Sequence, residues 1–100
     1  MYLKIGADGG MTLEETDDFS RFHISAAPQQ VLGPEASEAF TIIAETAGDN
    51  HFWLDAVAVA ALAERPDDEA WQSAFQQMLE KAEPYGFADT KLQRIKAHLA

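Results

Sequence analysis

Residues 51–63 read HFWLDAVAVAALA, and after Asp55 this stretch contains no polar side chain. A helix that is apolar on every side must be covered by other elements or lie in a membrane. The stretch is too short to cross a bilayer, which needs about 20 residues. We therefore expect a central helix that Asp49 or Asn50 caps through its side-chain oxygen, that ends near Glu64 and that the rest of the chain covers.

Three further helices are expected around the central one, over residues 34–47, 67–83 and 90–99. In each range, apolar residues recur at the spacing of one helical face. Glycine and proline residues separate the ranges and end the helices. The clearest apolar stripe belongs to residues 67–83 and comprises Trp71, Ala74, Phe75, Met78, Leu79 and Ala82.

The first 25 residues have the alternation of β-strands. Residues 2–14 predict a β-hairpin that turns at residues 8–10, Asp-Gly-Gly. Residues 21–25 could add a third antiparallel strand, with its apolar side chains inward and His23 outward. The competing interpretation is a short helix that starts at Thr16 and has Phe19 and Phe22 on one face. A turn through residues 17–20 followed by the strand would combine the two.

The predicted fold class is therefore α+β and mainly helical, in a single compact domain over residues 1–100. Residues 1–25 form its β-rich part, with two or three short antiparallel strands, and residues 34–100 form its helical part, with about four helices. One hundred residues leave little surplus to cover a helix that is apolar all round. We therefore expect a second copy of the chain to complete the cover, in a homodimer.

The formal net charge of −10 excludes the classes of protein that bind phosphate backbones or anionic lipid surfaces. We therefore expect neither a nucleic acid nor a membrane as partner. A basic protein or a neutral ligand remains compatible with the charge. The positive charges at Lys91, Arg94 and Lys96 lie close to the end of the predicted last helix, where the helix dipole favours them.

No cofactor or metal site is expected from the motifs. The chain has no cysteine, which excludes a disulfide framework and thiolate ligands. The acidic runs at residues 14–18 and 67–69 lack the ligand spacing of a calcium loop. The start of the chain has no export signal, so a cytoplasmic location is the expectation.

His51 and Asp55 are the first candidates for chemistry. Four residues apart on a helix, they would share one face, where the carboxylate could orient the imidazole for general-base catalysis. His23 could join them if the fold brings it close. The alternative is structural: Asp55 stabilises the first turn of the helix, and both histidines are ordinary polar residues.

Four aromatic residues could line a ligand pocket near the corner at residues 85–87. Pockets for small molecules are commonly lined by such side chains. The alternative is that the aromatic rings fill the core of an alanine-rich protein. The four candidates are Trp53, Trp71, Tyr85 and Phe87.

Three functional hypotheses follow. The first is a small acidic accessory or interaction domain that self-associates and has no catalysis of its own. The second is a small-molecule-binding protein or small enzyme that uses His51 and Asp55, with or without His23, beside an aromatic pocket. The third is an acidic inhibitor that binds the basic groove of a nucleic-acid-binding protein.

Overall fold

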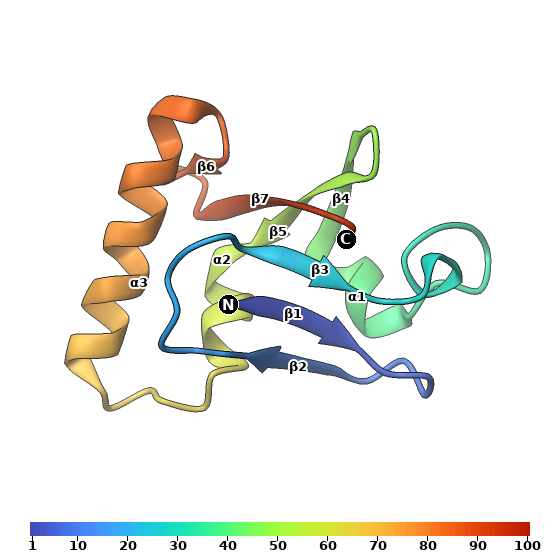
Figure 1. Ribbon diagram of the computed structural model, residues 1–100, viewed down its shortest axis with the longest axis horizontal. Helices are drawn as coiled ribbons and strands as arrows, with labels where there is room; N and C mark the ends of the chain where they lie inside the picture. Colours follow the sequence, from blue (N-terminus) through green and yellow to red (C-terminus); the bar gives the residue numbers. More distant parts are fainter.

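The computed structural model describes residues 1–100 and contains two β-sheets and three α-helices (Figure 1). The fold is α+β, but the prediction of a mainly helical protein built around a central apolar helix is wrong. Strands occupy much of the region predicted to be helical. They include residues 44–48 and 51–55 in the middle of the chain and residues 94–98 near its end.

The N-terminal sheet contains β1 (Tyr2–Ile5), β2 (Met11–Glu14) and β3 (His23–Ser25) in the order β2-β1-β3. The predicted hairpin is confirmed, because β1 and β2 pair antiparallel. The third strand also forms, but it runs parallel to β1 and not antiparallel. The chain between β2 and β3 passes to the other side of β1, so β3 starts beside Tyr2 and follows the direction of β1. The short helix at Thr16 does not form.

The helix predicted over residues 34–47 is shorter than expected. α1 covers only Glu38–Ile43, and Ser37 caps it by accepting a hydrogen bond from the backbone N–H of Phe40 (3.3 Å). The chain then continues as β4 (Ala44–Gly48). The two-residue turn after Gly48 pairs this segment with the following strand, which favours an extended chain over further helical turns.

The central helix predicted over residues 49–64 is mostly a strand and a short helix. β5 (His51–Asp55) pairs antiparallel with β4, and Asp49 and Asn50 form the hairpin turn between them with positive φ angles of 48° and 60°. α2 (Ala56–Ala61) has only six residues. The alternation of buried and exposed side chains in HFWLD is the period of a strand, and it outweighs the alanine content that suggested a helix.

The helix predicted over residues 67–83 is confirmed as α3 (Glu69–Ala82), which buries Trp71, Phe75, Met78 and Leu79.

The prediction of a helix over residues 90–99 is wrong. That region forms β7 (Arg94–His98), which pairs with the short β6 (Ala88–Asp89). Its buried residues alternate with polar ones, which is again a strand period. Two short 3₁₀ turns, η1 (Pro28–Gln30) and η2 (Glu83–Tyr85), lie in the connections.

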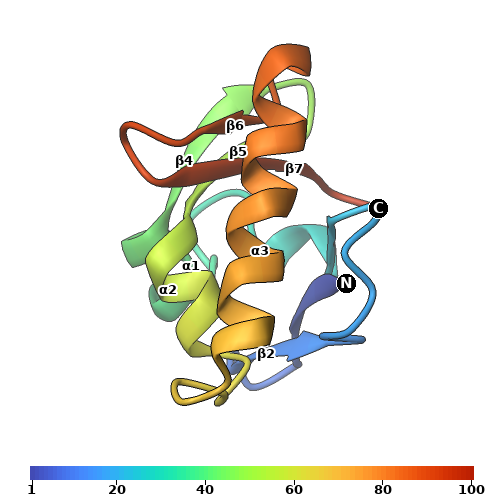
Figure 2. The same ribbon diagram turned by 90° about the vertical axis from the view of Figure 1, so that its left-hand side faces the viewer.

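The second sheet has the order β4-β5-β7-β6, and all its neighbours are antiparallel. A single parallel bridge between Ile24 and Leu99 joins it to the first sheet, with the N–H of Ala100 donating to the Ile24 carbonyl oxygen (2.9 Å). Figure 2 shows α3 running across the front of the strands with α2 beside it. The helices cover one face of the joined sheets, and one hydrophobic core lies between them.

Candidate functional site

All three histidines of the chain lie in one row across the joined sheets. His51 on β5 is directly opposite His98 on β7, and their ring centroids are 6.0 Å apart. The ring of His98 lies 6.1 Å from that of His23 on β3. Tyr2 on β1 extends the row by stacking on His23, with centroids 5.1 Å apart. Strands that are distant in sequence thus bring the histidines together.

Backbone carbonyls fix the orientation of two of these rings. Nδ1 of His23 lies 2.9 Å from the carbonyl oxygen of Arg21, and Nδ1 of His51 lies 2.9 Å from that of Asp49. A carbonyl can only accept a hydrogen bond, so Nδ1 carries the proton in both rings. In the neutral rings, Nε2 therefore keeps its lone pair.

Asp55 does not join the histidines. It ends β5 opposite Arg94, and its carboxylate caps α2 by accepting hydrogen bonds from the N–H groups of Val57 (2.9 Å) and Ala58 (3.2 Å). His51 begins the same strand, and four residues of strand separate their Cα atoms by about 13 Å. The helical spacing on which the predicted pairing of His51 with Asp55 depends is absent.

Three of the four aromatic candidates lie outside the pocket described below. Trp71 is a core residue that is 3% exposed, and its indole N–H donates to the carbonyl oxygen of Thr16 (2.7 Å). Trp53 lies on the sheet face away from the core, beneath the guanidinium carbon of Arg94 at 4.3 Å from its ring centroid. Tyr85 is 79% exposed. The fourth, Phe87, lines the pocket.

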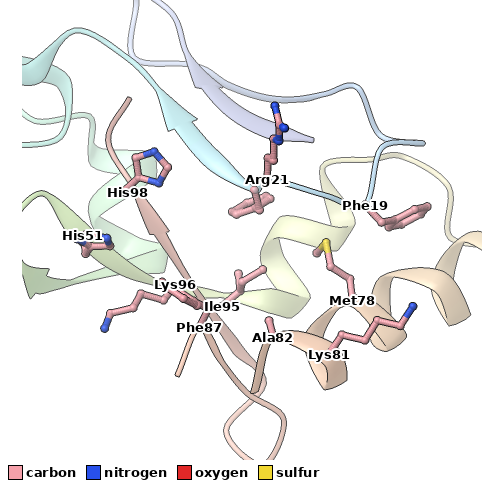
Figure 3. Close-up of a pocket in the computed structure, with 11 residues that line it drawn as sticks. Phe19, Arg21, His51, Met78, Lys81, Ala82, Phe87, Ile95, Lys96 and His98 are labelled. Carbon is pink, nitrogen blue, oxygen red and sulfur yellow. The ribbon is translucent and has the colours of Figure 1, made fainter. Parts of the chain in front are cut away.

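A pocket of about 350 Å³ opens where the two sheets part (Figure 3). One edge of β7 pairs with β5, and the other edge has two separate partners. At this second edge, β6 pairs with the first two residues of β7, and Leu99, just after β7, forms the bridge to Ile24. The pocket lies between these two contacts. Its apolar lining comes from the segment before β3, from α3, from β7 and from the residue before β6: Phe19, Phe22, Met78, Ala82, Ile95 and Phe87.

The backbone of β7 offers a hydrogen-bond donor to this gap. In an antiparallel pair, the backbone N–H groups of successive residues point alternately towards the partner strand and away from it. Lys96 faces away from β5 and donates to the carbonyl oxygen of Phe87 (2.8 Å). His98, two residues later, directs its N–H to the same edge. This N–H therefore points towards the gap between Phe87 and the bridge at Ile24.

Every titratable side chain that lines the pocket is basic. Three carry a positive charge, Arg21, Lys81 and Lys96, and the other two are His51 and His98. No carboxylate contributes to the lining, although the chain has 17 acidic residues. In Figure 3 the two histidines lie at one end of the pocket and Phe19 and Met78 at the other, while the three charged ends point outward from the rim. The pocket is thus an apolar cavity with a positive rim.

A second and larger groove, of about 750 Å³, lies between α2 and α3. Alanines of α2 and Phe75 line it, together with the amides of Gln72, Gln76 and Gln93. One acidic and one basic side chain, Glu64 and Arg65, also line it, so it has no excess of either charge. The groove therefore lacks the charge preference of the first pocket.

No group of three or more His, Cys, Asp or Glu side chains is arranged to hold one metal ion. None of the helices has the length and apolar character needed to cross a membrane. Comparisons with models of protein families, with curated proteins and with solved structures found no match.

Sequence reasoning identified His51, His23 and Phe87 but did not connect His98, Arg21, Lys81 or Lys96 with a site. The alternation of basic and buried residues over positions 94–98 was the available signal for the strand that carries Lys96 and His98. No local pattern indicates that residues 21, 81 and 96 surround one cavity, because that depends on how β3, α3 and β7 pack.

Proposed function

We propose that this chain binds a small organic anion, a carboxylate or phosphate group attached to an apolar body, in the pocket beside β7. The observation that carries the proposal is the positive rim around an apolar cavity in a protein of net charge −10. This develops the small-molecule hypothesis of the sequence analysis, with His51 retained and Asp55 left out.

The chemistry of the lining supports this ligand class. The rings of Phe19, Phe22 and Phe87 favour an apolar body, because covering apolar side chains from water lowers the free energy of the complex. A carboxylate or phosphate at the rim could accept a hydrogen bond from the His98 N–H and pair with Arg21 or Lys96. A cationic ligand would meet like charges at the same place.

The proposal is tested by titrating ¹⁵N-labelled protein with four ligands that share one alkyl chain: octanoate, octyl phosphate, octanol and octylammonium. EDTA is present throughout to remove metal ions. We expect the two anions to bind more tightly than octanol, octylammonium to bind least, and the largest amide shifts to occur at Phe87, Lys96 and His98. The comparison of the two anions identifies the preferred head group.

Variants at the rim provide the control. Lys96→Gln and Arg21→Gln should each weaken octanoate binding roughly two- to fivefold, as expected for one exposed charge. Lys91→Gln removes an exposed lysine that does not line the pocket and should leave the affinity unchanged. Equal affinity for octanoate and octylammonium would contradict the proposal, and so would amide shifts confined to the groove between α2 and α3.

Self-association is a second candidate function, favoured by two exposed aliphatic side chains. Ile42 is 82% exposed and Leu92 is 62% exposed, and they line one shallow depression beside Trp53. The original argument for a dimer no longer holds, since the chain has no central helix that needs cover. Sedimentation equilibrium tests the proposal: Ile42→Asp should shift the chain towards the monomer, whereas Tyr85→Ser should not. A monomer at high concentration in the unaltered chain would exclude this function.

A further inference from the structure

We propose that His98, together with either His51 or His23, binds one divalent transition-metal ion such as Zn²⁺ or Ni²⁺. The row of imidazoles is the juxtaposition that carries this inference, and it does not depend on the organic anion. Imidazole nitrogen is a preferred ligand for both ions.

The pair His51 and His98 has the separation that a shared ion requires. The two residues are direct cross-strand partners, and the N–H of Leu99 donates to the carbonyl oxygen of Asn50 (2.8 Å) beside them. That bond marks His51 and His98 as a non-hydrogen-bonded pair, the kind whose side chains approach most closely. Two imidazoles on one tetrahedral ion have ring centroids roughly 5 Å apart, given nitrogen to metal distances near 2 Å. The observed 6.0 Å is within a small rotation of that value.

The hydrogen bonds of the outer two histidines are those that metal-binding imidazoles make. Nδ1 of each donates to a backbone carbonyl, which fixes the ring and leaves Nε2 as the ligand atom. His98, between them, is exposed and can turn its ring towards either neighbour. The three rings do not converge on one point, so the ion takes two of them and completes its coordination with water.

Arg21 and Lys96 line the same pocket as His51 and His98, so their positive charges oppose the ion, and coordination by two imidazoles must outweigh this repulsion. The ammonium of Lys96 lies 5.4 Å from the ring centroid of Trp53 and contacts its face. The net charge of −10 attracts cations to the molecule as a whole. A hard ion such as Mg²⁺ prefers oxygen ligands and should not bind at this row.

The experiment is a titration of the full chain, dialysed free of EDTA and without organic ligand, with Zn²⁺ and Ni²⁺ in separate calorimetric runs. We expect one ion per chain, and Mg²⁺ to give no heat. In a parallel NMR titration with Zn²⁺, the Nε2 resonance of His98 and that of His51 or His23 should shift, a readout that needs no variant.

Substitutions then identify the ligands. His98→Gln should weaken binding at least about tenfold, since the ion loses the ligand common to both pairs. The double variant His23→Gln, His51→Gln should lose as much affinity as His98→Gln does. The single variants His23→Gln and His51→Gln show which of the two histidines binds the ion together with His98. Tyr2→Phe removes only a hydroxyl from the row and should bind as the unaltered chain does.

Three results would overturn the proposal: unchanged affinity in a folded His98→Gln variant, Zn²⁺ shifts confined to aspartate and glutamate residues, or no imidazole shift at about 1 mM Zn²⁺. Because the metal titrations contain no octanoate and the octanoate titrations contain EDTA, failure of one proposal is distinguishable from failure of the other.

Discussion

The side chain of Asp68 links the start of α3 to the loop before it. Its carboxylate accepts hydrogen bonds from the N–H of Trp71 (3.0 Å) and from Arg65 (2.7 Å), and so caps α3 and holds the preceding loop. Arg65 also donates to the Asp17 carboxylate (2.6 Å), which links the loop before α3 to the segment after β2. A single arginine between two aspartates therefore ties the helix to the N-terminal sheet.

The pKa of Asp68 provides a prediction for acid unfolding. The N–H of Trp71, and after it Arg65, lower the pKa of this carboxyl below its ordinary value of 3.8. A lowered pKa means that the folded state holds the charged form more strongly than the unfolded state does. The resulting contribution to stability is complete above the ordinary value and is lost as the pH falls through the folded pKa.

We therefore expect the free energy of unfolding to decrease less steeply below about pH 4 in Asp68→Asn than in the unaltered chain. Urea unfolding at a series of pH values measures this slope. Asp67→Asn is the matched control, because Asp67 is the exposed neighbour and its substitution should preserve the slope. The same slope in Asp68→Asn and in the unaltered chain would show that the cap does not carry the acid sensitivity. The Ser20 hydroxyl and N–H also lower the pKa of Asp18, so part of the slope should persist in Asp68→Asn.

At the scale of elements, the hairpin between β4 and β5 decides how the middle of the chain folds. Asp49 and Asn50 both adopt positive φ angles, the combination that favoured two-residue hairpin turns require. Asparagine and aspartate tolerate this region better than other residues that carry a Cβ atom. The turn thereby sets the register in which Phe52 and Leu54 face the core.

Replacing Asn50 tests the role of this turn. Asn50→Val should lower the free energy of unfolding by about 1–2 kcal/mol, because a β-branched residue is strained at a positive φ. Asn50→Gly should leave stability unchanged or raise it, since glycine adopts this conformation freely. Urea unfolding of both variants gives the comparison. Equal stability of the valine and glycine variants would mean that the turn does not determine the pairing of β4 with β5.

The elements that the sequence could predict are those whose pattern is complete within a short range. α3 and the hairpin of β1 and β2 were predictable, because each shows its period and its turn or cap within a short range. β5 has a strand period over only five residues, and the alanine-rich α2 follows it without a break. Continuous apolar composition concealed that boundary. Asp55 lies at this boundary and caps α2, whereas the sequence predicts a cap at Asp49 or Asn50.

The candidate site was less accessible to sequence reasoning than the elements were. His23, His51 and His98 become neighbours only because β7 lies between β5 and β3. Neither spacing nor composition predicts which strands pair when the partners are far apart in the chain. Phe87 was found because aromatic corners commonly line pockets, while the basic rim depended on tertiary packing.

At the scale of the whole molecule, the net charge of −10 dominates long-range electrostatics. Repulsion among like charges destabilises the compact state, and salt screens charges that are exposed and separated. Of the 17 acidic side chains, the four residues Asp17, Asp18, Asp68 and Glu45 take part in ion pairs of 4.0 Å or less. Most of the acidic side chains therefore have no ion-pair partner.

We expect the melting temperature to rise between low salt and about 0.15 M sodium chloride. Differential scanning calorimetry at several salt concentrations measures the shift. The variant Glu80→Gln, which removes one exposed charge outside these ion pairs, should show a smaller rise than the unaltered chain. A constant or falling melting temperature would indicate that basic side chains or bound cations compensate the acidic residues locally.

The position of β7 also has a kinetic consequence. This strand pairs with β5 along its whole length and with β6 over its first two residues. It reaches β3 through the bridge between Ile24 and Leu99, which are far apart in the chain. Loops that long must close before such contacts contribute, and folding slows as the sequence separation of contacts grows. We therefore expect the pairing of β7 with its distant partners to come late in folding. The imidazole row and the pocket form only when β7 is in place, so the proposed binding of Zn²⁺ or of an organic anion should appear together with this step.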